Sequence, residues 1–98
     1  MWILIEKILS SVNPEPLSST SIKCNQVLIQ AKRANAGAVG IGDSNLTATL
    51  RLELTKPVAD SQISVLTLGG TGQNCVNLDK LYLKGAIADG VNILYEIF

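Results

Sequence analysis

Apolar and polar residues alternate along two stretches near the middle of the chain. From Val27 onward every second residue is apolar, continuing with Ile29 and Ala31, and leucine occupies every second position of residues 50–55. Successive side chains of an extended chain point to opposite faces, so a period of two is typical of a strand with one buried face. The pattern predicts strands at 27–31 and 50–55, the second ending at Lys56-Pro57.

Turn-forming residues follow or separate further apolar stretches. The "NAG" at 35–37 leads into residues 38–42 and predicts a hairpin between 27–31 and 38–42. Residues 63–68 are rich in β-branched and aliphatic side chains and stop at a glycine-rich loop, which predicts another strand.

The chain closes with two apolar-rich segments, residues 78–84 and 91–98. The loop between them has Gly85 at one end and Gly90 at the other, and glycine adopts left-handed conformations without a Cβ penalty. We expect a closing hairpin in which alternate residues from Val91 to Ile97 face the core and the opposite face is only half polar.

Two weaker strand candidates lie nearer the N-terminus, at residues 2–9 and 17–23. The first also fits a helical stripe, and strand is the favoured alternative. With these, about eight short strands recur at intervals of about 8 to 12 residues. We therefore expect an all-β protein in which residues 1–98 form a single antiparallel β-sandwich or a small jelly-roll-like barrel.

The amino-acid composition indicates which classes of binding partner to expect. Hydrophobic residues make up 47% of the 98 residues and charged residues only 16%, below the usual value of about 25%. Eight basic and eight acidic residues cancel, which removes the electrostatic attraction toward nucleic acid or an anionic membrane. The stretch "MWILIEKILSSV" is not expected to be an export signal, because Glu6 and Lys7 interrupt its apolar run. We expect packing against other protein subunits, with neither nucleic acid nor membrane as partner.

The sequence gives little support for an enzyme activity. The chain has no histidine, the usual general base and a common zinc ligand. Its carboxylates fall on expected solvent faces or turns, among them Glu53, Asp60, Asp79, Asp89 and Glu96. The loop "GGTGQN" lacks the Lys-Ser/Thr of a phosphate-binding loop. We expect no enzyme activity, cofactor or metal site.

Two cysteines, Cys24 and Cys75, leave two alternatives open. They could form a disulfide, although two cysteines without a secretory context are more often reduced and buried.

Three segments of the chain carry a resemblance to a known group of proteins. They are, in order, "VLIQA" at 27–31, "NAGAVGIGDS" at 35–44 and "LDKLYLKGAIADGVNILYE" at 78–96. In these segments the chain resembles small virion structural proteins of tailed bacteriophages. It departs from that group at Gly40, where an aromatic residue is common, and in its longer "GGTGQNCVN" loop. The resemblance implies a β-sandwich that coats or cements a capsid, or sits elsewhere in the particle, in many identical copies.

The functional expectation is a capsid decoration or minor capsid subunit, located in the virion after assembly in the bacterial host cytoplasm. Its expected partners are its own copies, as a trimer or a higher ring, and the major capsid protein or other virion proteins. The alternative is a carbohydrate-binding module, which four aromatic residues in the whole chain support poorly. The candidate interface residues are apolar and come from the two ends of the chain: Trp2, Ile3, Leu4, Ile5, Leu94 and Phe98.

Overall fold

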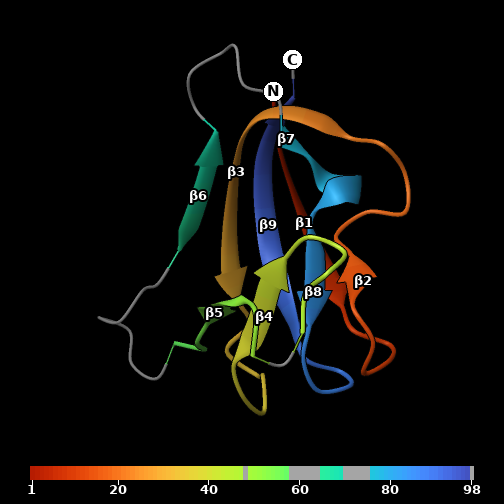
Figure 1. The fold of residues 1–98 in the computed structure, drawn as a ribbon. Helices are drawn as coiled ribbons and strands as arrows, with labels where there is room; N and C mark the ends of the chain where they lie inside the picture. The colour runs from red at the N-terminus through yellow and green to blue at the C-terminus, as the bar shows by residue number, and fades with distance from the viewer. Residues whose placement is uncertain (48, 58–64, 70–75, 98) are drawn as a thin grey trace.

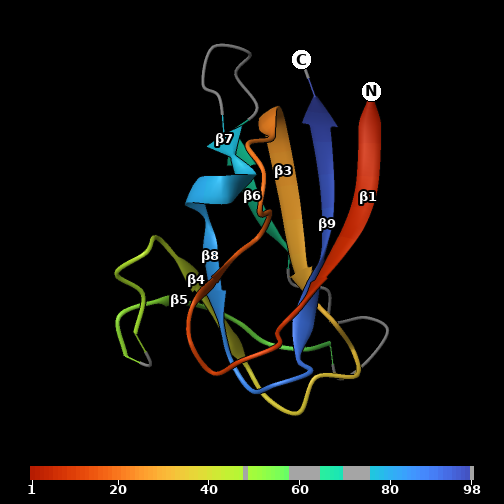
Figure 2. The same ribbon diagram turned by 90° about the vertical axis from the view of Figure 1, so that its right-hand side faces the viewer.

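The computed structural model, which describes residues 1–47, 49–57, 65–69 and 76–97, contains two antiparallel sheets (Figure 1). The first has the order β1-β9-β3-β6, with β7 also pairing with β3, and the second has the order β2-β8-β4-β5. Figure 2 shows the two sheets as separate layers, and the all-β prediction is confirmed as a small β-sandwich. The first sheet contains β1 (Trp2–Ile8), β3 (Lys23–Ala31), β6 (Leu66–Gly69), β7 (Val76–Asn77) and β9 (Gly90–Ile97). The second contains β2 (Glu15–Pro16), β4 (Val39–Gly42), β5 (Leu52–Leu54) and β8 (Tyr82–Lys84).

The core forms on the inward faces of β3 and β9, where the expected alternation is confirmed. Ile29 lies directly opposite Ile93, and both are completely buried. The pairs on either side are also buried, namely Val27 with Tyr95 and Ala31 with Val91. Fully burying a large aliphatic side chain contributes about 1.5–3 kcal/mol, so these two strands form the stable centre of the first sheet.

The second sheet covers this core with apolar side chains of its own. Val39 and Ile41 of β4 and Leu83 of β8 are buried against the first sheet. Loop residues also contribute, because Leu9 and Leu17 are 1% and 3% exposed.

Both predicted hairpins are wrong. β3 lies in the first sheet and β4 in the second, and the closing strands β8 and β9 are divided in the same way. Each connecting loop crosses from one sheet to the other. In the loop before β9 the left-handed residue is Ala88, with φ 76°, rather than either flanking glycine. Gly90 instead allows close approach, since a Cβ there would lie 2.2 Å from the Lys7 carbonyl oxygen.

Other segments differ in extent from the prediction. Residues 17–22 form no strand, although Leu17 is held by a 2.8 Å bond from its N–H to the Leu81 carbonyl. Residues 78–80 form a 3₁₀ turn, so that of the predicted strand at 78–84 only Tyr82–Lys84 is a strand. The strand expected at 50–55 is restricted to β5, and the one expected at 63–68 is described only from residue 65. At the N-terminus strand is confirmed over helix, with alternating burial along β1.

The expectation that Asp89 is a solvent-facing carboxylate is wrong. This residue is 4% exposed, and its carboxylate accepts hydrogen bonds from the backbone N–H groups of Ala36 and Gly37 at 2.8 and 3.2 Å. Beside it, the buried side chain of Asn35 bonds both the N–H and the C=O of Gly90. The two crossing loops are therefore tied together by a satisfied buried polar cluster. Of the other expected solvent-facing carboxylates, Glu53 is exposed, Asp79 and Glu96 are half-buried, and Asp60 lies outside the described residues.

Candidate interaction surface

The outer face of the first sheet carries a row of side chains that crosses four strands. Leu4 of β1 lies directly opposite Leu94 of β9, which in turn lies opposite Leu28 of β3. Leu28 is paired on its other side with Thr67 of β6. The even-numbered residues of β1 share this face because side chains alternate along a strand.

A shallow groove follows this row. Its volume is about 240 Å³, and its lining is Leu4, Leu28, Gln30, Val65, Asn92 and Leu94. Leu4 is 70% exposed and Leu94 is 37% exposed. The described lining of this groove is apolar apart from two amide side chains, which suits it to binding another apolar surface.

Paired charges border the groove. Lys32 donates hydrogen bonds to the carboxylate of Glu6 and, at 3.2 Å, to the side-chain oxygen of Asn92. The same lysine and glutamate form an ion pair across the end of the row. At this end of the row the two charges therefore neutralise each other.

The structure separates the predicted interface residues into two sets. Trp2, Leu4 and Leu94 lie on the outer face, with Trp2 45% exposed. Ile3 and Ile5 are half-buried and pack against the core. Phe98 lies outside the described residues. The prediction missed Leu28, whose position gave a signal, since it is an apolar residue on the polar face of an otherwise alternating strand.

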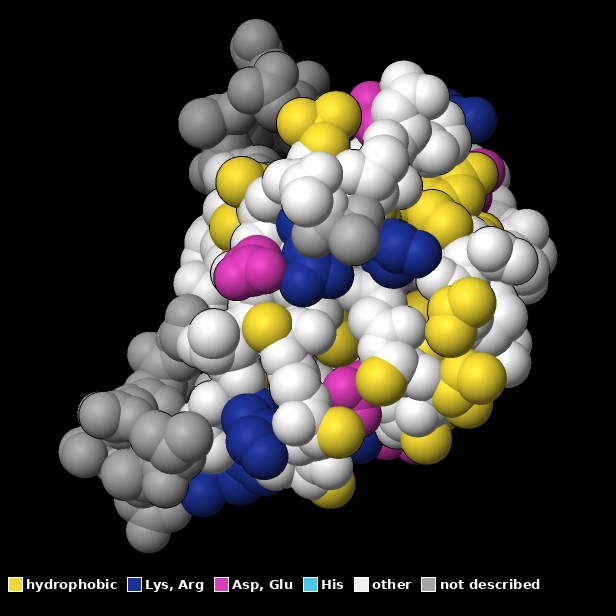
Figure 3. Space-filling model, turned by 60° about the horizontal axis from the view of Figure 1, so that its bottom comes forward, with side chains coloured by type: hydrophobic (Ala, Val, Ile, Leu, Met, Phe, Trp, Pro, Cys, Tyr) yellow, Lys and Arg dark blue, Asp and Glu magenta, His cyan; other side chains and the backbone are white. Residues whose placement is uncertain are grey.

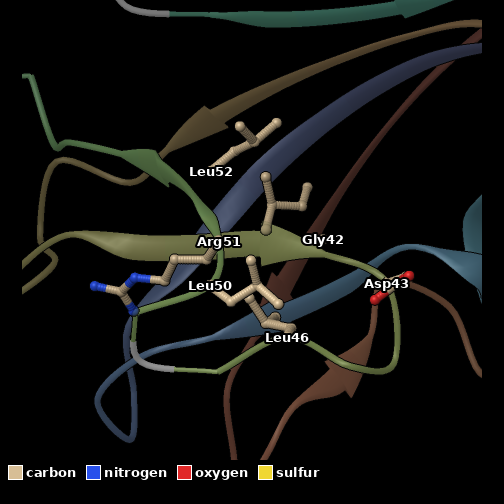
Figure 4. A pocket seen from close by; sticks show the side chains of 7 residues that line it. Gly42, Asp43, Leu46, Leu50, Arg51 and Leu52 are labelled. Atoms are coloured by element: carbon tan, nitrogen blue, oxygen red, sulfur yellow. The ribbon is translucent and has the colours of Figure 1, made fainter.

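A second hollow of about 360 Å³ lies beside β4 and β5 (Figure 4). Figure 4 shows Leu46 and Leu50 between the side chains of Arg51 and Asp43, which lie on opposite sides of the hollow. Leu50 and Leu52 were expected to be buried, but they are 68% and 62% exposed. Of this leucine row only Leu54 is buried, so β5 reaches the core with its last residue.

The Arg51 side chain packs against the glycine at position 40. It lies across the β4 backbone, where a Cβ on Gly40 would come within 2.1 Å of the arginine Cδ. The guanidinium donates to Glu53 at 2.9 Å. A larger residue at position 40 would displace this arginine and reshape the edge of the hollow.

An ion pair ties β1 to the second sheet. The Lys7 ammonium lies 2.9 Å from Glu15 Oε1, and the N–H groups of Ser10 and Ser11 donate to Oε2 at 3.0 and 2.8 Å. The lysine foremost, and then the two amides, lower the pKa of the Glu15 carboxyl from its usual value near 4.5 to about 2. This contact holds the chain where it leaves β1 and turns toward β2.

The described residues also bear on other kinds of functional site. In the ranges that the structure describes, no three His, Cys, Asp or Glu side chains gather as a metal site would require. No helix within those ranges is long and apolar enough to cross a membrane. Cys24 is buried and Cys75 lies outside the described residues, so the choice between a disulfide and two reduced cysteines is not tested by the described residues. On the face shown in Figure 3, hydrophobic side chains form several separate groups and residues of opposite charge lie close together.

Comparisons of the chain with models of protein families, with curated proteins and with solved structures gave no significant match.

Proposed function

We propose that the chain is a structural protein of a tailed bacteriophage particle, acting as a capsid decoration or minor capsid subunit. In this proposal it binds the shell through the outer face of its first sheet and also binds further copies of itself. The three sequence segments that resemble small virion proteins support the identity of the particle. The exposed groove around Leu4 and Leu94 supports the mode of binding.

The single observation that carries the proposal is an apolar row on an outer sheet face in a chain with no net charge. Burial of apolar area contributes about 25 cal/mol per Å² and needs no catalytic or charged group. A subunit repeated many times over a shell can use such a surface, because every copy meets the same complementary patch. The ion pair at the border adds little attraction of its own, because it is partly exposed to solvent.

The test is whether the chain is part of particles and whether the groove holds it there. The full-length tagged chain is produced in bacteria in which the phage carrying its gene is induced, and particles are purified on a density gradient. We expect the wild-type chain in the particle fraction and at least a tenfold loss with Leu4→Lys, which places a charge in the groove.

Ile87→Lys is the matched control, because Ile87 is 60% exposed but lies outside the groove. It should remain with the particles. Absence of the wild-type chain from washed particles would contradict the proposed function. Equal retention of the two lysine variants would contradict the role of the groove.

The carbohydrate-binding alternative is supported by one feature, the half-exposed indole of Trp2 at the end of the same outer face. A sugar site usually presents several aromatic rings, and Tyr95 is buried in the core. Glycan-array binding that is lost in Trp2→Ala would favour this alternative over a virion role.

A further inference from the structure

One edge of the first sheet is formed by β1, and its outward backbone groups can be assigned. The Leu9 N–H donates to the Asp89 carbonyl at 2.9 Å, and the Ile97 N–H donates to the Met1 carbonyl at 3.1 Å. Both bonds continue the register in which β1 pairs with β9. In an antiparallel pair, residues that exchange hydrogen bonds alternate with residues that do not. The odd-numbered residues of β1 therefore bond to β9, and the even-numbered ones direct their N–H and C=O groups away from it.

Four residues of β1 therefore direct their backbone groups away from β9: Trp2, Leu4, Glu6 and Ile8. Among the strands that the structure describes, β1 pairs with β9 alone, and Figure 2 shows β1 at the margin of its sheet. A row of unpaired backbone groups is a template for another strand. The partner strand can be identified from the same residues.

We infer that the free edge of β1 pairs in antiparallel fashion with β1 of a second copy of this chain. The product is a two-fold symmetric dimer in which the first sheets of the two copies form one continuous sheet. Pairing of this kind gains affinity from main-chain hydrogen bonds and specificity from the alternate side chains.

The other described edge strands are less suitable. β2 has two residues and includes Pro16, which has no N–H to donate. β5 has three residues and β7 has two. β6 has four and ends at Gly69 in a left-handed conformation, with φ 81°. By contrast, β1 has seven residues in unbroken register, without proline, glycine or a bulge.

A second copy fits this edge because β1 is complementary to itself. With the two-fold axis at Ile5, Trp2 of one copy lies opposite Ile8 of the other, and Leu4 lies opposite Glu6. All four outward positions then gain a main-chain partner. A shift of the axis to Glu6 would place two carboxylates directly opposite each other, which is destabilising.

Charge on the strand does not oppose the pairing. An inward-pointing lysine can protect an edge from unwanted partners, and Lys7 points inward. Its ammonium is, however, neutralised by Glu15 at 2.9 Å. Glu6 is likewise paired with Lys32. Since the whole chain has no net charge, two copies experience little long-range repulsion.

This inference rests on the self-association included in the proposed function and replaces the expected trimer or ring with a dimer. It is tested without particles, so its failure leaves shell binding untouched. An isologous contact closes on itself, and a two-fold dimer is the resulting assembly.

The first experiment compares Glu6→Pro with Glu6→Ala by sedimentation of the full chain at tens of micromolar. Both variants lose the ion pair with Lys32, but only proline removes the outward N–H at position 6. The bonds of the neighbouring odd-numbered residues to β9 are retained. We expect wild type and Glu6→Ala to be dimers and Glu6→Pro to be a monomer, with at least a tenfold weaker dimer constant. Circular dichroism should show that Glu6→Pro keeps its strand content.

The second experiment tests the register between the two β1 strands by cross-linking. It does not require that the Glu6→Pro variant folds. The proposed axis brings Ile5 opposite its own copy in a non-hydrogen-bonded pair, where the Cα separation is about 4.5 Å and within disulfide range. Under mild oxidation Ile5→Cys should form a covalent dimer. Ile3→Cys, which faces Lys7 of the other copy, should give no more cross-linking than wild type.

A wild-type dimer that Glu6→Pro weakens and Ile5→Cys cross-links supports the inference. It is overturned by a wild-type monomer or trimer, by equal dimerisation of the two Glu6 variants, or by cross-linking that is no greater for Ile5→Cys than for Ile3→Cys.

Discussion

Replacing Glu15 with glutamine should weaken the protein in a way that depends on pH. The substitution keeps the size of the side chain and one oxygen that can accept from Ser10 or Ser11. It removes the negative charge that lies 2.9 Å from the Lys7 ammonium. The tie between β1 and the turn into the second sheet would then lose its ionic component.

The size of the effect follows from the pKa of Glu15. A fall from 4.5 to about 2 corresponds to about 3 kcal/mol if the whole shift is converted into stability. The side chains of Lys7 and Glu15 are 25% and 15% exposed, so solvent screens part of the interaction. We expect the free energy of unfolding to fall by about 1–2 kcal/mol at about pH 7.

The direction of the pH dependence is fixed by the lowered pKa. The ionised carboxylate stabilises the folded chain fully above pH 4.5, and this stabilisation is lost as the pH falls toward 2. At about pH 3 only about 40% of it remains. The stability gap between wild type and Glu15→Gln should therefore narrow on acidification.

Urea unfolding, followed by circular dichroism at several pH values, measures this gap. Glu53→Gln is the control, because Glu53 also forms a 2.9 Å ion pair, with Arg51, but its side chain is 56% exposed. Its effect should stay within about 0.5 kcal/mol. A Glu15→Gln gap that is constant or larger at low pH, or an equal loss in Glu53→Gln, would refute the reasoning.

Three further substitutions and one control test the backbone and the buried polar cluster by thermal or urea unfolding. Gly69→Ala should destabilise by at least about 1–2 kcal/mol, because φ is 81° and the new Cβ would lie 2.2 Å from the Asn25 carbonyl oxygen. Gly37→Ala, where no atom lies within 4 Å, should change stability by less than about 0.5 kcal/mol, and a comparable loss there would contradict this explanation. Ala88→Gly should raise stability by up to about 1 kcal/mol, since glycine relieves the left-handed strain at φ 76°, and any loss would count against that strain. Asn35→Ala should cost about 2–4 kcal/mol because the backbone groups of β9 that its side chain binds at 2.9 and 2.8 Å would be left unpaired, and a neutral result would show that water replaces them.

Which residues become strand and which face is buried could be predicted for the central strands. Val27, Ile29 and Ala31 are all buried, as their alternation indicates. The physical reason is local, because a period of two places one set of side chains on one face whatever the partner strand is. At β1 the favoured strand was also correct over the competing helix, although its first four residues are all apolar and do not alternate with polar ones.

The candidate surface was only partly predictable. Apolar residues at the two ends of the chain pointed to an exposed adhesive surface, and Leu4 and Leu94 do lie side by side on an outer face. Alternation places Leu4 on the face opposite Ile3 and Ile5, but both faces are apolar, so it could not indicate which one turns toward the core. It also could not show that Leu28 completes the row, because this depends on the register between β3 and β9.

Tertiary structure decided the pairing of strands and the burial of polar groups. The segments on either side of the loop at 85–89 have the pattern of a hairpin, yet β8 and β9 belong to different sheets. Alternation reports which face is buried but carries no information about the neighbour to which the backbone bonds. Asp89 is buried because its loop lies against the loop between β3 and β4, and the N–H groups of Ala36 and Gly37 in that second loop donate to its carboxylate. The exposure of Leu52 was also decided by tertiary structure. Its leucine pattern predicts a buried face, but Leu52 lies at the end of β5 that extends beyond the core.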